Sequence, residues 1–239
     1  MIHLPAPCAR GAAHRLFEAL GTRGVRWVEW LEGMADPDLA TLVCAEGLKP
    51  EDLDRMVATG RGAGGARLLV LSRIGAHPDA RAHALSALWA LEERARATGL
   101  PVLTLRLGPL VGPRSPLWLK LATRPRLPRG GRHLLNPVGE EYAVETIDRA
   151  LSGRAAWEGW YEVAGPETMS LAELAALASE WPEDGAPGTR GDWEPPLEEI
   201  SEHRLCEASP WLEHFKIAVQ PLAERAAAWF TAAASGASP

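Results

Sequence analysis

The residues of this chain that could carry acid/base chemistry are a serine and a histidine close together in the sequence. Ser72 ends an apolar run, and His83 lies in the segment that follows. The imidazole of His83 could act as an acid/base group near the Ser72 hydroxyl. The alternative is that His83 is an ordinary histidine on the surface of a helix.

The same region lacks two residue types that proton transfer to a carbonyl often uses. Lys49 and Lys120 bracket a stretch without lysine, and the only tyrosines, Tyr142 and Tyr161, lie beyond it. A phenol activated by a nearby ammonium group is therefore not available there. The three cysteines show no CxxC pairing and the seven histidines no ligand spacing, so we expect no metal site.

Composition is that of an ordinary globular protein. The chain has 239 residues, of which 46% are hydrophobic, enough to bury a sizeable core. No segment approaches the run of about 20 apolar residues that spans a bilayer, and residues 1–20 lack a signal-peptide pattern. We expect a cytoplasmic protein, and the alternative is a peripheral position at the inner face of a membrane.

Charge is distributed unevenly along the chain. Between Glu93 and Glu140 there are nine basic residues and no acidic one, so the rest of the chain carries −15 if the total is −6. This asymmetry favours an electrostatic face. The alternative is that these arginines pair with acids from elsewhere in the fold. Nucleic acid is not an expected partner, because the stretch holds a single aromatic residue, Trp118, and the pI is about 5.7.

The apolar pattern predicts a doubly wound parallel α/β sheet. We expect strands at residues 1–4, 25–31, 39–45, 67–72 and 101–107, and helices at 10–20, 50–60 and 79–98. Further helices are predicted at 117–122, 141–151, from 171 onward and at 221–234, with a strand at 160–163, a loop at 181–196 and a disordered tail at 235–239. The ligand site of such a sheet lies at the carboxyl ends of its strands.

Five phrases resemble, in their order and spacing, the extended and atypical short-chain dehydrogenase/reductase superfamily. They are LVLSRIGA at 69–76, Glu92 with ATGL at 97–100, LRLGPLVGP at 105–113, NPV at 136–138, and YEVAGPE at 161–167 with SLAEL at 170–174. The segment PWLEHFKI at 210–217 is similar to the branch with the dehydrogenase-like accessory subunit of respiratory complex I. The resemblance implies a Rossmann-like core over residues 1–115 and a C-terminal portion over 116–239.

In that superfamily a GxxGxxG turn after the first strand lets the backbone approach the cofactor pyrophosphate. The matching positions here are Pro5, Cys8 and Gly11. Proline has no N–H and cysteine adds a side chain, so only Gly11 keeps the pattern. Glu29 matches the acidic residue that binds the ribose, although an edge glutamate without a ligand is the alternative.

The resemblance also places Arg73 and Pro109 beside the cofactor. The segment that connects the strands at 25–31 and 39–45 has too few residues for the further strand and helix that usually form the adenosine side of the pocket in that superfamily. We therefore expect no NAD(P) binding, or only weak binding.

The superfamily's catalytic groups are a serine after a central strand and a Tyr-xxx-Lys pair on the next helix. Ser72 matches the serine. Counting back from the helix glutamate places the pair at Ala84 and Leu88, and a shift of one residue gives His83 and Ala87. Neither pair can replace tyrosine and lysine.

Three functions are compatible with these features. The first is a degenerate, non-catalytic protein that acts as an accessory, assembly or regulatory subunit of a larger complex. Trp118, Lys120, Arg124 and Arg126 would then contact a protein partner or anionic lipid, or this short helix would simply pack on the core. The second is an NAD(P)H-dependent reductase, epimerase or isomerase with non-standard catalytic residues. The third is a nucleotide-sensing binding protein.

Overall fold

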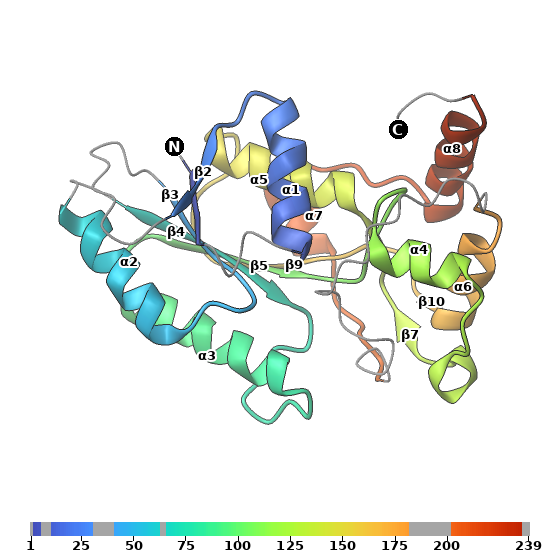
Figure 1. Cartoon of the computed structure of the whole chain (residues 1–239), viewed down its shortest axis with the longest axis horizontal. Coiled ribbons are helices and arrows are strands. Elements are labelled where there is room, and N and C mark those ends of the chain that lie inside the picture. Colours follow the sequence, from blue (N-terminus) through green and yellow to red (C-terminus); the bar gives the residue numbers. More distant parts are fainter. Residues whose placement is uncertain (1, 6–10, 31–40, 63–65, 182–201, 236–239) are drawn as a thin grey trace. The chain divides into compact units, whose positions relative to one another are not determined.

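The computed structural model describes residues 2–5, 11–30, 41–62, 66–181 and 202–235 (Figure 1). The chain forms two compact units. Unit 1 comprises Met1–Leu107 and Thr146–Tyr161, and unit 2 comprises Gly108–Glu145 and Glu162–Pro239. The predicted division into a core at residues 1–115 and a C-terminal portion at 116–239 stays a prediction.

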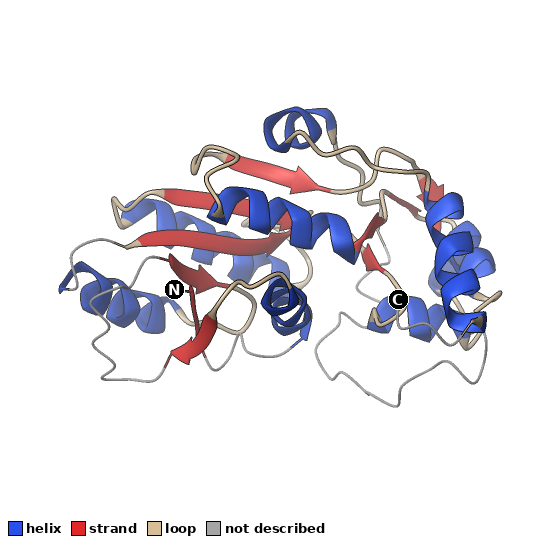
Figure 2. Ribbon diagram, turned by 90° about the horizontal axis from the view of Figure 1, so that it is seen from above, coloured by secondary structure: helices blue, strands red, loops and turns tan. Residues whose placement is uncertain are grey.

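Unit 1 is organised around a parallel six-stranded sheet, whose longer strands run side by side in Figure 2. Its strands are β1 (Ile2–Pro5), β2 (Trp27–Trp30), β3 (Thr41–Cys44), β4 (Arg67–Arg73), β5 (Val102–Leu107) and β9 (Trp160–Val163), in the order β2-β1-β3-β4-β5-β9. The first five pair in parallel. Strand β9 also runs parallel to β5. Thr104 N donates to Gly159 O (3.0 Å) and Gly108 N donates to Val163 O (2.9 Å), so residue numbers increase in the same direction along the two segments. The predicted α/β fold class is confirmed.

Helices cover both faces of this sheet. Helices α2 (Pro50–Gly62) and α3 (His83–Ala97) pack on one face, and α1 (Gly11–Thr22) lies on the other (Figure 1). Pro50 starts α2 in the position where proline fits a helix best, followed by acids that suit the helix dipole. The predicted start of a helix at residue 79 was wrong, because Ala82 has an extended backbone (φ −78°, ψ 118°) and α3 begins only at His83.

The strand order agrees with a shortened first half. In the usual doubly wound order two strands lie on the outer side of the first strand. In the described part of this chain β2 alone lies on that side of β1. The point where the chain reverses direction across the sheet therefore falls between β1 and β3, and the crevice of a doubly wound fold lies at their carboxyl ends.

Unit 2 contains short strands and packed helices. The elements are β6 (Leu110–Val111), α4 (Pro116–Ala122), η2 (Pro128–Gly131), β7 (Leu134–Leu135), β8 (Val138–Gly139), α5 (Glu140–Leu151), β10 (Met169–Ser170), α6 (Leu171–Ala178), α7 (Ser209–Phe215) and α8 (Leu222–Ala234). Strands β6 and β8 pair in parallel, and β10 and β7 antiparallel. Both α5 and β9 continue across the boundary into unit 1.

The core of unit 2 is built around tryptophans. Trp118 is fully buried and meets Trp229 edge to face, with ring centroids 5.4 Å apart. Ser170 caps α6 in the predicted capping box with Glu173. Helix α7 was not predicted, and the predicted loop at 181–196 lies, apart from Trp181, outside the described residues.

Candidate functional site

The candidate site lies at the carboxyl edge of the sheet in unit 1. Strand β1 ends at Pro5 and α1 begins at Gly11, so these two residues flank the predicted nucleotide turn. Cys8 lies outside the described residues. Glu29 lies on β2, in register with Leu4 of β1. A proline at the end of β1 has no N–H to offer a phosphate, which leaves Gly11 as the only matching residue of the turn.

Ser72 lies near the carboxyl end of β4, where the resemblance expects a catalytic serine. Its side chain is only 1% exposed, and its Oγ has no hydrogen-bond partner among the described residues. On the neighbouring strand Ser72 is in register with Arg106. A buried hydroxyl without a partner contributes little to stability, because it has lost water without gaining a hydrogen bond.

Of the two positions expected for tyrosine and lysine, the lysine position, Leu88, lies in an apolar cluster. Leu88 is 2% exposed and packs with Leu85 and Ala76. Trp89 packs against this cluster from the helix, and Ala84 is half-buried. No phenol or ammonium group occupies this part of α3, so the helix face that would carry the catalytic pair contributes to the core.

His83 is the first residue of α3 and is exposed. Its carbonyl oxygen accepts a hydrogen bond from Ser86 Oγ at 3.0 Å. Because Ser72 Oγ has no hydrogen-bond partner in the described part of the chain, the structure does not join Ser72 and His83 into an acid/base pair. The hypothesis of a helix-surface histidine describes His83 better.

Arg73 is held by an acid from the next strand end. Its Nη2 lies 3.3 Å from Oε1 of Glu46, which follows β3. The arginine side chain is 17% exposed and the glutamate 40%. Sequence reasoning proposed Arg73 for a cofactor and missed Glu46. The ion pair reduces the positive charge available to a pyrophosphate at this edge.

Neither tyrosine of the chain has the features of an activated phenol. In unit 2, Tyr142 Oη accepts a hydrogen bond from Gln220 N at 3.0 Å, a contact that fixes the backbone. In unit 1, burial raises the pKa of Tyr161, and the negative charge of Glu158 raises it further. Proton transfer by a catalytic tyrosine needs a lowered pKa, so Tyr161 has the opposite environment.

Pro109 has a structural contact in unit 2. Its carbonyl oxygen accepts a hydrogen bond from Val138 N at 3.0 Å, just before the pairing of β6 with β8. Asn136, which sequence reasoning did not propose as a site residue, donates to the Glu167 carbonyl (3.1 Å) and accepts from Cys206 N (3.2 Å). This buried amide joins three segments of unit 2.

The environment of Cys206 disfavours a reactive thiol at this position. Burial raises the pKa of Cys206 to about 12, and the nearby charges of Glu162 and Glu207 act in the same direction. A thiol with such a pKa holds almost no thiolate near neutral pH. Within the described part of the chain, no group of three or more His, Cys, Asp or Glu side chains could hold a metal ion.

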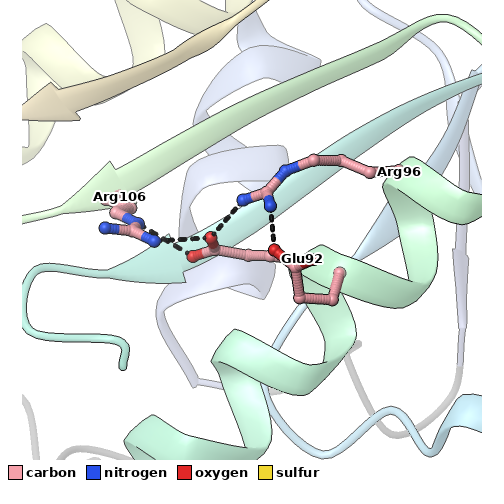
Figure 3. Close-up of polar contacts among 4 residues, drawn as sticks. Glu92, Arg96 and Arg106 are labelled. Atoms are coloured by element: carbon pink, nitrogen blue, oxygen red, sulfur yellow. Dashed lines mark hydrogen bonds and ion pairs between the residues drawn. The ribbon is translucent and has the colours of Figure 1, made fainter. Parts of the chain in front are cut away.

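A buried carboxylate on α3 forms ion pairs with two arginines. Glu92 has a fully buried side chain and accepts two hydrogen bonds from Arg106 of β5, at 2.9 and 2.7 Å. Arg96, one turn further along α3, reaches the same carboxylate at 3.1 Å. Figure 3 shows the Glu92 carboxylate between the two guanidinium groups. This network links α3 to the sheet. We therefore interpret Glu92 and its two arginines as structural residues and not as catalytic ones.

The proposed partner segment divides into buried and exposed residues. Trp118, predicted as a contact residue, is instead fully buried in the unit 2 core, because α4 packs its apolar side against α6 and α8. Lys120, Arg124 and Arg126 are exposed as the prediction requires. No helix in the described part of the chain is long and apolar enough to cross a membrane.

Comparison with known proteins detects similarity only in structure. No family model and no curated protein matches the sequence. MoeE5, solved with UDP-glucose and NAD, superposes with a TM-score of 0.66 at 16% identity, covering 98% of this chain and 99% of that one. UDP-glucose 4-epimerase from Thermotoga maritima gives 0.65 at 12% identity, with coverage of 98% and 99%.

A third solved structure has a different activity on the same fold. The NAD-dependent NDP-hexosamine 5,6-dehydratase TunA gives a TM-score of 0.62 at 13% identity and covers 98% of this chain and 97% of its own. Sequence identities this low establish a common fold and nothing about activity. They do not test the resemblance to the complex I subunit branch. The protein thus has the Rossmann-type α/β fold of the extended short-chain dehydrogenases/reductases.

Proposed function

We propose that the protein is a non-catalytic relative of these enzymes that acts as an accessory or assembly subunit of a larger complex. The observation that carries the proposal is the apolar cluster of Ala76, Leu85 and Leu88. Leu88 of this cluster stands at the position where the resemblance expects the lysine. A lysine at position 88 would place its ammonium group where the leucine side chain is now only 2% exposed, and burying that charge would carry a large desolvation cost.

The two surviving candidates for proton transfer support the same proposal. Ser72 Oγ is buried without a partner in the described part of the chain, and His83 is exposed. A general base acts only within hydrogen-bond reach of the proton that it removes. The environment of Tyr161, which raises its pKa, gives no replacement for the missing tyrosine.

The cofactor edge gives independent support. Pro5 replaces the first glycine of the nucleotide turn, and Glu46 engages Arg73 at the neighbouring strand ends. NAD binding in this fold depends on backbone N–H groups and on a close approach of the pyrophosphate. We therefore propose that NAD(P) binding is lost or weak.

The second candidate function is an NAD-dependent epimerase or related enzyme with non-standard catalytic residues. It is favoured by one observation, that solved structures covering nearly the whole chain contain NAD and a UDP-sugar. A fold supports many activities, so this similarity does not outweigh the altered residues.

Titration with NADH and NADPH separates the two proposals. The ten tryptophans provide a fluorescence signal, and a UDP-glucose 4-epimerase serves as the positive control. We expect no saturable binding below about 1 mM, whereas a functional cofactor site gives micromolar dissociation constants. Micromolar NADH binding, or turnover of UDP-glucose, would contradict the proposal.

Ser72→Ala sharpens this test. If Ser72 is not catalytic, the variant keeps its unfolding free energy or gains up to about 1 kcal/mol, because the wild-type hydroxyl is buried without a partner. Urea unfolding measures the change. An activity that the wild type shows and Ser72→Ala loses would instead establish the enzyme.

A further inference from the structure

The nine basic residues of the acid-free stretch fall into two groups in the structure. Arg94, Arg96 and Arg106, all in unit 1, each contact an acid. The other six are exposed and have no ion pair within the described part of the chain. They form the basic segment of unit 2: Arg114, Lys120, Arg124, Arg126, Arg129 and Arg132. The hypothesis that the arginines pair with acids elsewhere therefore holds for the first group only.

The basic segment is held in place by its apolar side chains. Leu117, Trp118 and Leu121 of α4 are buried in the unit 2 core. Further on, Gly131 has φ +73°, and a Cβ there would lie 2.9 Å from the backbone nitrogen of Ala172 in α6. The segment is thus anchored at both ends, and its cations project from a fixed backbone. Little conformational freedom of the backbone is lost when such a surface binds a partner.

Two of these arginines occupy backbone conformations that disfavour arginine. Arg124 has φ 52° and Arg129 has φ 49°, and only one further non-glycine residue in the described chain, Lys216, has a positive φ. Glycine adopts this region without strain, and it is the usual residue just after a helix, where Arg124 lies. Arginine at both positions makes no ion pair in the described residues that would offset the strain. Such strain is a typical feature of functional surfaces.

The chemistry of the segment favours carboxylates on a folded partner. Guanidinium groups pair with carboxylates in a planar, two-pronged geometry, and five of the six cations are arginines. Base stacking or membrane insertion would need exposed aromatic or apolar side chains. The large hydrophobic residues exposed in the described chain are Trp160 and Leu205, both outside the segment.

The net charge of the chain also favours a protein partner over a membrane or a nucleic acid. The whole chain carries −6, and a membrane plane or a duplex presents negative charge well beyond the segment. Any acid of this chain that came within the Debye length of about 8 Å of such a surface would be repelled. A protein partner with a local acidic cluster avoids most of this repulsion.

We propose that the basic segment is a docking surface for a protein partner that presents a cluster of carboxylates. This deepens the proposed function by naming the surface and the chemistry of the partner. Its test is separate from that of the cofactor site. A protein that binds NADH can still dock in this way, and a protein that fails to dock can still lack catalysis.

The test uses the full chain with poly-L-glutamate as the acidic probe, at about 50 mM NaCl where surface charges are weakly screened. We expect saturable binding that weakens as salt rises. The double variant Arg124→Gly/Arg129→Gly should lower the affinity at least about fivefold, because two exposed cations that have no ion pair among the described residues are lost while the backbone strain is relieved. Arg55→Gln/Arg154→Gln removes the same charge from exposed positions of unit 1 that already pair with acids, and should change the affinity less than about twofold.

Three results would overturn the proposal. One is the absence of saturable binding at low salt. Another is an equal loss of affinity in both double variants, which would mean that net charge alone governs binding. The third is tighter binding of phosphatidylserine vesicles or duplex DNA than of poly-L-glutamate at matched charge, which would assign the surface to a membrane or a nucleic acid.

Discussion

Three arginines of unit 1 (Arg94, Arg96 and Arg106) and the basic segment of unit 2 come from one acid-free stretch and meet opposite environments. Arg96 and Arg106 converge on the buried carboxylate of Glu92, and Arg94 pairs with Asp54 of α2 at 2.6 Å. The basic segment of unit 2 has no such partner among the described residues. Arg96 pairs with an acid on its own helix, whereas Arg94 and Arg106 pair with acids that the fold brings from a neighbouring helix.

The two groups should therefore respond differently to substitution. A buried carboxylate with two guanidinium partners cannot lose its charge without leaving a cation uncompensated. An exposed arginine without a partner contributes almost nothing to folding. Arg94, Arg96 and Arg106 would act mainly on stability, and the arginines of the basic segment on binding.

Glu92→Gln gives the largest effect expected. It leaves Arg106, whose side chain is 16% exposed, without its carboxylate. Removing one partner of a buried pair costs about 3 kcal/mol of unfolding free energy. Urea unfolding measures the loss, and Arg126→Gln serves as the control, with a change within about 0.5 kcal/mol. Equal losses in both variants would remove the distinction between the two groups.

Arg124→Gly has a smaller effect of the opposite sign. Glycine relieves the left-handed backbone conformation at φ 52°, so we expect stability to rise by up to about 1 kcal/mol. The matched control is Arg126→Gly, at a position with an ordinary φ, where glycine adds only unfolded-chain entropy and should not stabilise. A clear loss of stability in Arg124→Gly would show that this arginine supports the fold.

Arg94→Gln is the mildest test, because the pair is exposed. Its hydrogen bond to Asp54 holds the pKa of that carboxyl below its usual value. Asp54 therefore favours the folded state above the usual carboxyl pKa, and this contribution is lost as the pH falls through the lowered value. In Arg94→Gln we expect the pKa of Asp54 to rise, as followed by NMR titration of its carboxyl carbon. An unchanged pKa would mean that the ion pair is absent in solution.

Much of the fold could be predicted because its signals are local. The buried strand β4, the capping box of Ser170 and Glu173, and the strand β9 at residues 160–163 follow from short patterns. The start of α3 could not be placed, since residues 79–82 have helical composition but turn conformations. Helix α7 was missed because its seven residues begin with Ser209 and Pro210 and show too few turns for a periodic pattern.

The candidate site was harder to predict, because its contacts join distant residues. The absence of tyrosine and lysine near Ser72 was visible in the sequence, but the burial of Leu88 depends on the packing of α3. Glu46 was missed because only the pairing of β3 with β4 brings it to Arg73. The amphipathic segment 117–122 allowed both a buried and an exposed Trp118, and the helices of unit 2 decide for burial.

The most direct test measures affinity and stability on the same samples of the wild type and Arg124→Gly/Arg129→Gly. Each sample is titrated with poly-L-glutamate and then unfolded in urea. The account predicts that the variant binds at least about fivefold more weakly while its unfolding free energy is equal to or above that of the wild type. A variant that binds as well as the wild type, or that loses affinity and stability together, would contradict it.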